Sequence, residues 1–374
     1  MELQIRKAEW QDIDSMMALF DHSRSLMRVT GNPNQWVGGY PQRKLIESDL
    51  NAGHSYVVTE SEEVVGTFAF FIGEEPTYQT IYHGHWLDDT IQYGTLHRMA
   101  RAPLAHGIAD AAIDWCARQV TSLRADTHAD NRIVQHLLER HNFVYCGEIQ
   151  LDDGTWRRAY QRIDHHTVST TLRHHVEREI LPQYDTFDPA HSRQHILTVI
   201  AHSMSLARHY PVLPDMVYAI AAYHDLGMTE GRDLHHLTAG RLVRKDTRLR
   251  QWFDAEQIEV IAQAVEDHRA SSQQEPRSIY GKIVAEADRD IDSEKIVLRT
   301  LQFGWKHYPH ADKEEQWRRT IAHLHEKYSE EGYMKLWIPE SANAERLAEL
   351  RRLIADKAKL RKLFEQLYRP EKQS

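Results

Sequence analysis

The chain has 374 residues, of which 41% are hydrophobic and 27% are charged, and its formal net charge is −9. This length exceeds what one ordinary hydrophobic core fills, so two domains are expected. The negative charge argues against a nucleic-acid-binding surface, and no apolar stretch reaches the roughly eighteen residues that span a bilayer.

The two cysteines, Cys116 and Cys146, are too few to predict a disulfide framework. The first residues run directly into a strand pattern, which is not typical of a signal peptide. We therefore expect a cytoplasmic protein without a membrane partner. The one unusual count is 25 histidines, which favours a search for metal ligands.

The first 163 residues alternate between strand-like and helical patterns. Strands are expected at 3–8, 55–59, 64–72, 96–100, 123–126, 143–149 and 158–163, and helices at 12–28, 43–51, 107–120 and 131–141. Residues 73–95 are rich in Tyr, His and Gly and are expected to form an irregular loop beside a substrate. This order predicts a mixed β-sheet with helices on its faces.

The junction between the strand 96–100 and the helix that opens at Gly107 is a candidate anion site. A short loop followed by a helix N-terminus leaves backbone N–H groups unpaired and pointing outward. Close packing is the alternative explanation for a single glycine at a helix start, and this feature alone leaves both open.

Three segments carry a resemblance to the GNAT family of N-acetyltransferases: Leu96-His-Arg-Met-Ala100, His106-Gly-Ile-Ala109 and Asp126-Thr-His-Ala-Asp-Asn131. Residues 1–163 as a whole are similar to that fold. The resemblance implies acetyl-CoA as cofactor, with the strand of Met99 pairing with its pantetheine arm. The backbone around Gly107, Ile108 and Ala109 would hold the pyrophosphate. Asn131 would lie near the reacting end, where an acceptor amine attacks the thioester.

Two positions depart from the pattern of that family. The pyrophosphate loop usually begins with Gln or Arg and has a further glycine, whereas Leu104 stands here and the loop is shorter. The tyrosine that often serves as general acid is replaced by Leu138. Tyr145 or His97 could take that role, although a packed strand residue is the favoured interpretation for Tyr145 and a hydrogen-bonded core histidine for His97.

From Asp164 the composition changes, and the polar segment 164–171 is predicted to be a linker. Helical spacing follows at 172–181, 191–210, 215–226, 238–245, 255–267, 279–290 and 305–328, and in a long charged helix at 343–368. These segments predict an all-α bundle over 172–340. The apolar stripe of the last segment, 341–374, is expected to pack on the bundle or on another subunit of a homo-oligomer.

The dipeptide His224-Asp225 stands inside an apolar helical run, where an imidazole beside a carboxylate needs a partner or a metal. His195 lies upstream of it and Asp288 downstream, each on a separate predicted helix. Such ligands from separate helices suit a divalent hydrolytic metal better than a closed structural zinc site. A capped helix end with a surface His-Asp pair is the alternative.

The order His195, then His224-Asp225, then Asp288 resembles the HD superfamily of metal-dependent phosphohydrolases over roughly residues 170–300. The resemblance implies that these four residues bind a divalent ion, whether Mn, Mg, Fe, Co or Zn. Asp225 would also orient the attacking water, which makes it a catalytic candidate.

Some members of that superfamily hold a second metal through further histidines. His235 and His268 stand where those ligands would fall, although the adjacent His236 competes with His235. The segment Glu266-Asp-His-Arg269 places an acid, a base and a cation together, so Asp267 and His268 are further catalytic candidates.

These observations predict a two-domain enzyme. One domain would be an acetyl-CoA-dependent N-acetyltransferase, and the other a metal-dependent phosphohydrolase acting on a nucleotide or another small phosphate ester. The alternative is a sensor whose degenerate GNAT-like domain binds acetyl-CoA or a small ligand without turnover, while the helical domain binds a nucleotide. The substitutions at Leu104 and Leu138 keep that alternative open.

Overall fold

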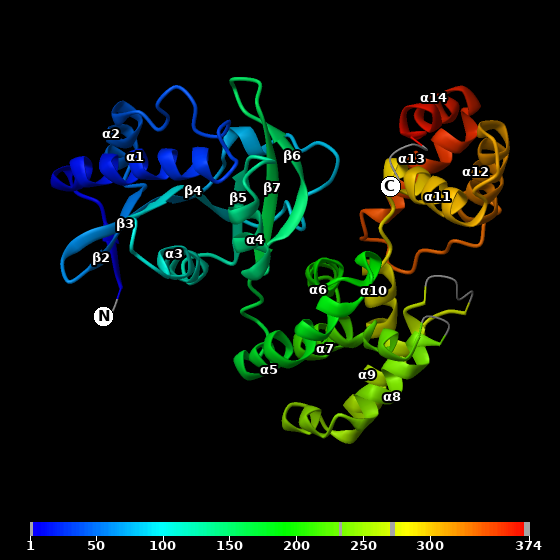
Figure 1. Cartoon of the computed structure of the whole chain (residues 1–374). Helices are drawn as coiled ribbons and strands as arrows, with labels where there is room; N and C mark the ends of the chain where they lie inside the picture. The colour runs from blue at the N-terminus through cyan, green and yellow to red at the C-terminus, as the bar shows by residue number, and fades with distance from the viewer. Residues whose placement is uncertain (1–2, 232–233, 270–273, 370–374) are drawn as a thin grey trace. The chain divides into compact units, whose positions relative to one another are not determined.

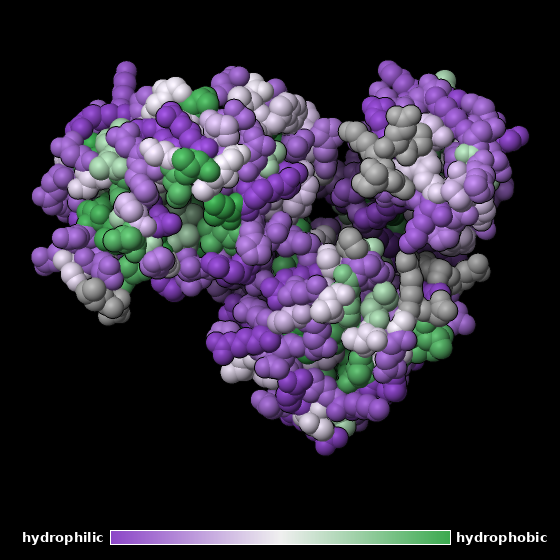
Figure 2. Space-filling view, viewed as in Figure 1, coloured by the Kyte–Doolittle hydropathy of each residue, from purple (hydrophilic) through white to green (hydrophobic). Residues whose placement is uncertain are grey.

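The computed structural model describes residues 3–231, 234–269 and 274–369. The chain divides into two compact units, Met1–His166 and Thr167–Ser374. Figure 1 shows a sheet flanked by helices in the first unit and helices alone in the second. The face seen in Figure 2 is largely hydrophilic. Among the described helices, none combines the length and the apolar composition needed to cross a bilayer.

The described part of the first unit contains a seven-stranded sheet with the order β1-β2-β3-β4-β5-β7-β6. The strands are β1 (Gln4–Lys7), β2 (Ser55–Glu60), β3 (Glu63–Ile72), β4 (Tyr93–Arg101), β5 (Ser122–Thr127), β6 (Val144–Gln150) and β7 (Trp156–Ile163). Neighbouring strands are antiparallel except for β4 and β5, which are parallel. The mixed sheet confirms the fold class predicted for this half of the chain.

Helices cover both faces of this sheet (Figure 1). They are α1 (Ile13–Val29), α2 (Arg43–Asn51), α3 (Ile108–Ala117) and α4 (Arg132–Arg140). Successive side chains of a strand point to opposite faces. Val57 of β2 accordingly packs in the cluster built by α1 and α2, whereas Val58 packs in the cluster built by α3 and α4.

The strands β4 and β5 pair over only part of their length. The ladder joins Tyr93, Gly94 and Thr95 to Ser122, Leu123 and Arg124, and the pairing of this fully described region stops there. The register between β3 and β4 shifts beside Arg98, whose φ is 51°. Such a bulge bends a strand and re-aims its side chains. The C-terminal halves of β4 and β5 therefore diverge and leave room for a ligand.

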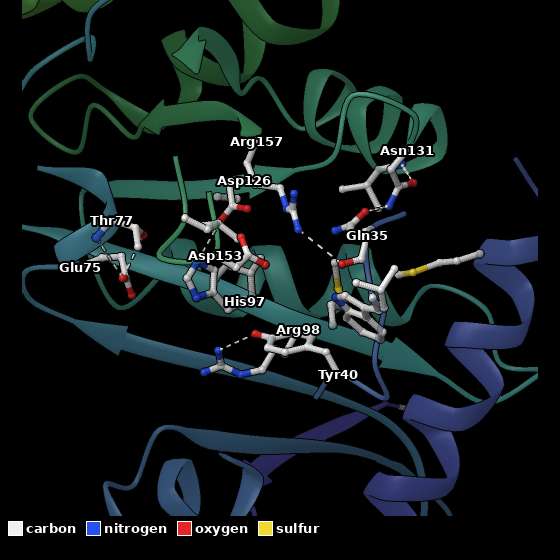
Figure 3. Close-up of a pocket in the computed structure, with 18 of the residues that line it drawn as sticks. Gln35, Tyr40, Glu75, Thr77, His97, Arg98, Asp126, Asn131, Asp153 and Arg157 are labelled. Carbon is white, nitrogen blue, oxygen red and sulfur yellow. Dashed lines mark hydrogen bonds and ion pairs between the residues drawn. The ribbon is translucent and has the colours of Figure 1, made fainter. Parts of the chain in front are cut away.

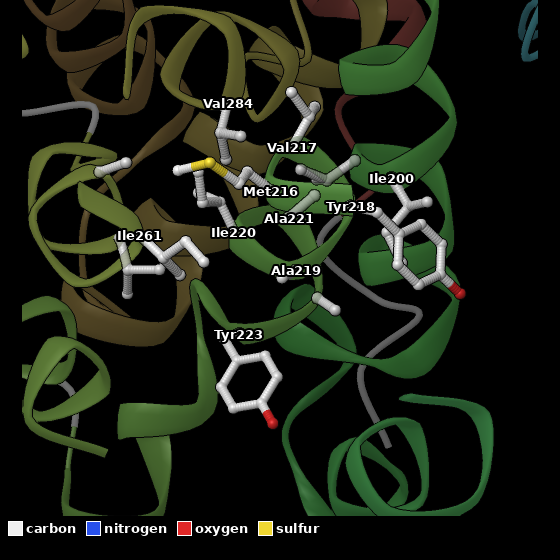
Figure 4. Packing of buried hydrophobic residues seen from close by; sticks show 14 of the residues in the cluster. Ile200, Met216, Val217, Tyr218, Ala219, Ile220, Ala221, Tyr223, Ile261 and Val284 are labelled. Atoms are coloured by element: carbon white, nitrogen blue, oxygen red, sulfur yellow. The ribbon is translucent and has the colours of Figure 1, made fainter. Parts of the chain in front are cut away.

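The second unit is helical, as predicted. Its α-helices are α5 (Thr170–His175), α6 (Arg193–Ala207), α7 (Pro214–Tyr223), α8 (His235–Lys245), α9 (Ala255–Asp267), α10 (Ile279–Ala287), α11 (Ser293–His307), α12 (Lys313–Tyr328), α13 (Asn343–Ala355) and α14 (Lys357–Leu367). Residues 216–223 of α7 are all buried, so α7 forms the centre of the bundle. Figure 4 shows this core, with Ile200, Ile261 and Val284 packed in the same cluster from α6, α9 and α10.

Several predicted helices have other bounds in the structure; the one predicted at 172–181, for example, is an α-helix only as far as His175. The helix predicted at 215–226 ends at Tyr223. The helix predicted at 305–328 is interrupted around Pro309, which cannot continue a helix, and α12 begins after the N-cap Asp312. The long helix predicted at 343–368 is broken at Asp356, whose side chain accepts a hydrogen bond from the Lys359 backbone N–H at 3.1 Å. In both interruptions an aspartate caps the helix that follows.

Helices α11 to α14 share a second hydrophobic cluster in this unit. A buried carboxylate of α10 holds the segment that leads into α13. Glu286, which is 0% exposed, accepts hydrogen bonds from the Trp337 backbone N–H at 2.8 Å and from Asn343 Nδ2 at 3.1 Å. Because Asp288 lies two residues further along, this anchor also fixes the end of α10.

We expect Glu286→Ala to lower the free energy of unfolding of the second unit by about 1–3 kcal/mol, because the Trp337 backbone N–H loses its acceptor and Asn343 Nδ2 keeps only its bond to the backbone carbonyl of residue 286. Urea denaturation followed by tryptophan fluorescence measures the loss. The exposed Glu349 provides the control, since Glu349→Ala should change stability by less than about 0.5 kcal/mol. Equal stabilities of the two variants would contradict the anchoring role.

Candidate functional site

Helix ends place a cluster of histidine and aspartate side chains in the second unit. His224, His268 and Asp288 are the C-cap residues of α7, α9 and α10, and Asp225 follows His224 directly. A helix C-terminus carries partial negative charge because its last carbonyl groups are unpaired. Three such ends at one place favour a bound cation.

The first half of the cluster contains two imidazoles and two carboxylates. Oδ2 of Asp225 lies 3.6 Å from Nε2 of His195 and 3.3 Å from Nε2 of His224. Oδ1 of Asp288 lies 3.1 Å from Nε2 of His195 and 3.8 Å from Nε2 of His224. These four residues, which α6, α7 and α10 supply, are the ones that the sequence order indicated.

The second half lies on the other oxygen of Asp225. Its Oδ1 is 3.4 Å from Nε2 of His235 and 3.3 Å from Nε2 of His268, and the two Nε2 atoms are 3.3 Å apart. Asp225, His235 and His268 form one ligand group of the described chain, and His195, His224 and Asp225 form another. One carboxylate therefore faces two groups, which is a geometry suited to bridging two ions.

Backbone hydrogen bonds set the tautomer of two of these rings. Nδ1 of His224 lies 2.8 Å from the Ala221 carbonyl oxygen, and Nδ1 of His268 lies 2.5 Å from that of Val265. Each Nδ1–H thus donates to the backbone, so Nε2 is the ring nitrogen that faces the cluster. Nε2 of His224 is buried and makes no hydrogen bond with the described residues. A buried nitrogen of this kind fits a metal ligand.

The charges of the cluster also favour a cation. Burial lowers the pKa of His224, but the carboxylates of Asp225 and Asp288 outweigh it and raise that pKa to about 9. Burial raises the pKa of Asp288, but His195 and His224 bring it down to about 2. Asp225 is buried and Asp288 is partly buried, and two ionised carboxylates so close together need positive charge beside them, which a divalent ion can supply.

Two candidates from the sequence lie outside these groups. The Asp267 carboxylate accepts hydrogen bonds from the Arg277 backbone N–H at 2.8 Å and from its Nε at 2.9 Å, and the structure does not bring Asp267 into any ligand group of the described residues. His236, the competitor of His235, is also absent from those groups. Burial and the nearby His268 lower the pKa of His236 to about 4.

The first unit holds a cavity of about 500 Å³ where β4 and β5 diverge (Figure 3). Met99 and Asn131 line it, as does Leu138, which replaces the expected tyrosine. Asn131 is the N-cap of α4, and its Nδ2 donates to Oε1 of Gln35 at 2.7 Å. The contact between Asn131 and Gln35 was not predicted, because it joins residues 96 positions apart.

The structure explains Gly107 by its backbone rather than by packing. Its φ is 71°, and a Cβ there would meet only Leu3, at an ordinary 3.9 Å. It is the N-cap of α3 and provides no side-chain cap, so the amides of Ile108 and Ala109 keep their N–H groups for another acceptor. The Ile108 side chain is buried in the core, so only its backbone can contact a ligand.

The loop before Gly107 is held by an arginine that the sequence argument missed. The Arg101 guanidinium donates to the carbonyl oxygens of Ala102 and Pro103 at 3.0 Å and of Ala105 at 3.1 Å. These three carbonyl groups point toward the Arg101 guanidinium, so their oxygens do not face an anion that binds at the start of α3. Leu104, at 88% exposure, contributes no such contact.

Of the two proposed replacements for the missing tyrosine, only His97 lines the cavity. Its Nε2 lies 2.9 Å from the Tyr78 hydroxyl and 3.0 Å from Oδ1 of Asp126. Tyr145 is 42% exposed on β6, and its ring packs against Tyr160. Tyr78 lies in the segment 73–95 that was expected beside a substrate, but its contact with Asp126, 48 positions away, was not predicted.

Comparisons with known proteins assign both units. The family model described as HD domain matches residues 193–290, the segment that carries the His/Asp cluster. Among solved structures, a GNAT-family acetyltransferase from Streptococcus agalactiae is 34% identical over 44% of this chain and 96% of that chain, with a TM-score of 0.41. The chain belongs to the GNAT family through its first unit.

This assignment rests on the sequence identity over nearly the whole length of the Streptococcus protein. A second GNAT acetyltransferase, from Listeria monocytogenes, is 18% identical over 44% of this chain and 95% of that chain, with a TM-score of 0.35. No curated protein matches the chain. The predicted fusion of a GNAT unit with an HD domain is confirmed.

Proposed function

We propose that the chain is a bifunctional enzyme, an acetyl-CoA-dependent N-acetyltransferase joined to a divalent-metal-dependent phosphohydrolase. The acceptor would be an amine, and the second substrate a nucleotide or another small phosphate ester. The observation that carries the hydrolase half is Asp225, whose Oδ2 faces His195 and His224 and whose Oδ1 faces His235 and His268. An HD domain over 193–290 supports the same class of chemistry.

His195, His224, Asp225 and Asp288 would hold one ion, and Asp225, His235 and His268 a second. A bound ion of this kind lowers the pKa of a water and polarises a phosphoryl oxygen. The residues of the chain do the rest. Asp225 can accept a hydrogen bond from the attacking water, and the backbone contacts of His224 and His268 keep both rings from rotating. The buried position of His224 excludes bulk water from that side.

In the acetyltransferase half, the diverging ends of β4 and β5 would receive the pantetheine arm, beside Met99. The free amides of Ile108 and Ala109 would hold the pyrophosphate at the positive end of α3. Asn131 would lie along the arm, in the cavity shown in Figure 3. The family membership supports these roles, and the cavity supports those of Met99 and Asn131, which line it.

Metal analysis of the purified full-length protein tests the hydrolase half. A phosphatase and phosphodiesterase screen with the detected metal added should then reveal turnover. Calorimetry with acetyl-CoA, followed by a thiol-release assay over a panel of amines, tests the other half. Acetyl-CoA binding without transfer to any amine would favour the sensor alternative instead.

Gly107→Glu should weaken acetyl-CoA binding by at least tenfold, which is about 1.4 kcal/mol. The carboxylate would stand at the helix end where the pyrophosphate binds and would repel it. Gly107→Asn is the matched control, because Asn tolerates a positive φ and brings no charge, so its loss should be smaller. Calorimetry measures both affinities. Equal affinity of Gly107→Glu and the unchanged protein would contradict this binding site.

A further inference from the structure

We propose that His97, oriented by Asp126 and Tyr78, is the general base that deprotonates a cationic amine acceptor in the cavity of the first unit. This inference rests on the proposed N-acetyltransferase function and adds to it a catalytic residue and a charge class for the acceptor.

The three side chains form a closed hydrogen-bonded group at the point where β4 and β5 separate. The Tyr78 hydroxyl donates to Oδ1 of Asp126 at 2.8 Å and lies 2.9 Å from Nε2 of His97. Nε2 of His97 is itself 3.0 Å from Oδ1 of Asp126. His97 and Asp126 both line the cavity, and both are labelled in Figure 3.

These contacts fix which ring nitrogen of His97 carries the proton. The single proton of Tyr78 is donated to Asp126, so the Tyr78 oxygen can only accept from His97. Nε2 must therefore carry N–H, directed at Tyr78 and Asp126, and Nδ1 keeps its lone pair. No hydrogen bond to Nδ1 is found among the described residues. The imidazole of His97 is held by a partly buried carboxylate, and its second nitrogen has no hydrogen bond to the described residues. General-base catalysis requires this arrangement.

Tyr78 and Asp126 keep the protonation states that this arrangement requires. Burial and the charge of Asp126 raise the pKa of Tyr78 well above its ordinary value, so Tyr78 remains a donor. Burial raises the pKa of Asp126, but the hydrogen bonds from His97 and Tyr78 and the positive charges nearby together outweigh it and lower that pKa overall. Asp126 therefore remains an anion and stabilises the imidazolium that forms when His97 takes a proton.

The charged side chains that line the cavity favour a positively charged acceptor. Four carboxylates line it, from Glu75, Asp126, Asp152 and Asp153, against the guanidinium groups of Arg98 and Arg157. Arg98 is already paired with Asp49 at 2.8 Å. The excess of negative charge attracts an ammonium group. An ammonium nitrogen has no lone pair for attack, so such an acceptor needs a base.

The reaction balances with the chain's own groups. Nδ1 of His97 takes one proton from the ammonium group, which leaves a neutral amine. The amine nitrogen attacks the thioester carbonyl carbon, a C–N bond forms, and the C–S bond breaks. The second amine proton goes to the departing thiolate, and His97 returns its proton to solvent. The products are the acetamide, the free thiol and one proton.

The test compares His97→Gln and Asp126→Asn with the control His136→Gln, which changes an exposed histidine of α4. The probes are acetyl-CoA with butylamine and with 1,4-diaminobutane, followed by thiol release. We expect His97→Gln to lower kcat/KM by about 100-fold or more, with acetyl-CoA affinity within about twofold of the unchanged protein by calorimetry. His136→Gln should behave as the unchanged protein, and the diamine should be preferred.

Asp126 is a positioning residue, so its variant needs a different readout. Long-range ¹H–¹⁵N NMR should show the His97 ring as the Nε2–H tautomer, identified by its absence in His97→Gln, and Asp126→Asn should shift that equilibrium. Full activity of His97→Gln, an Nδ1–H ring in the unchanged protein, or bound acetyl-CoA with no transfer to either amine would overturn the proposal. Failure to bind acetyl-CoA at all would instead refute the proposed N-acetyltransferase function on which it rests.

Discussion

Asp225→Asn is expected to abolish phosphohydrolysis and to remove most of the bound metal, while N-acetyl transfer stays unchanged. The substitution keeps the shape of the side chain but removes the charge and one of the two oxygens. Oδ2 lies 3.3 Å from Nε2 of His224, and Oδ1 lies 3.3 Å from Nε2 of His268, so both ligand groups lose their common member. Removing a residue that only hydrogen-bonds to a metal ligand lowers metal affinity or activity by about 10- to 100-fold. Asp225 is itself a ligand of both groups, so its loss should lower them further.

The experiment measures metal content by mass spectrometry and hydrolysis with the substrate that the screen identifies. Asp267→Asn is the matched control, because it makes the same change near the end of α9 on a carboxylate that is bonded to Arg277. We expect it to keep its metal and its hydrolytic activity. Circular dichroism should show both variants folded. Full metal occupancy in Asp225→Asn would refute the assignment of the cluster.

Local patterns predicted most elements of this chain. The helix α2 has the predicted bounds, Arg43–Asn51, because its apolar spacing and its flanking residues agree. The helix α9 also has its predicted bounds, Ala255–Asp267, since Asp254 and Gln257 form a capping box at its start. Periodicity could not predict which distant helices lie together around His224. The resemblance to the HD superfamily predicted this.

The ends of helices were harder to predict, and they matter most for the site. His224 was placed inside a helix, whereas it is the C-cap of α7. The run 216–223 is buried on all sides, and an all-apolar helix has no polar face whose loss would mark its end. The C-cap position is what lets the His224 ring bond the Ala221 carbonyl oxygen.

The His97 group was out of reach of sequence reasoning for a different reason. His97 was recognised as a candidate acid, but nothing local predicts its contact with Tyr78 or with Asp126. Tyr78 ends a short 3-10 helix, Pro76–Tyr78, and Asp126 lies in β5, beyond the three positions at which that strand pairs with β4. Where two strands separate, register no longer relates their side chains, so only the three-dimensional structure brings these residues together.

His268→Ala is expected to retain about one metal per chain and to lose most of the hydrolytic activity. The substitution removes one of the three members of the group formed by Asp225, His235 and His268. The other group keeps His195, His224 and Asp288, together with Oδ2 of Asp225, so one ion can still bind. Two ions together stabilise both the attacking and the leaving oxygen of an in-line displacement, so the loss of one should lower the rate strongly.

Metal content under saturating manganese, measured beside turnover, tests this expectation. His195→Ala should behave differently from His268→Ala, because it removes a ligand of the first group and should release the ion held there. His236→Ala is the matched control, since His236 lies next to His235 but belongs to no ligand group of the described residues, and it should keep both ions. One ion per chain in the unchanged protein, with normal turnover in His268→Ala, would show that a single ion suffices. Loss of the second ion in His236→Ala would instead make His236 the ligand in place of His235.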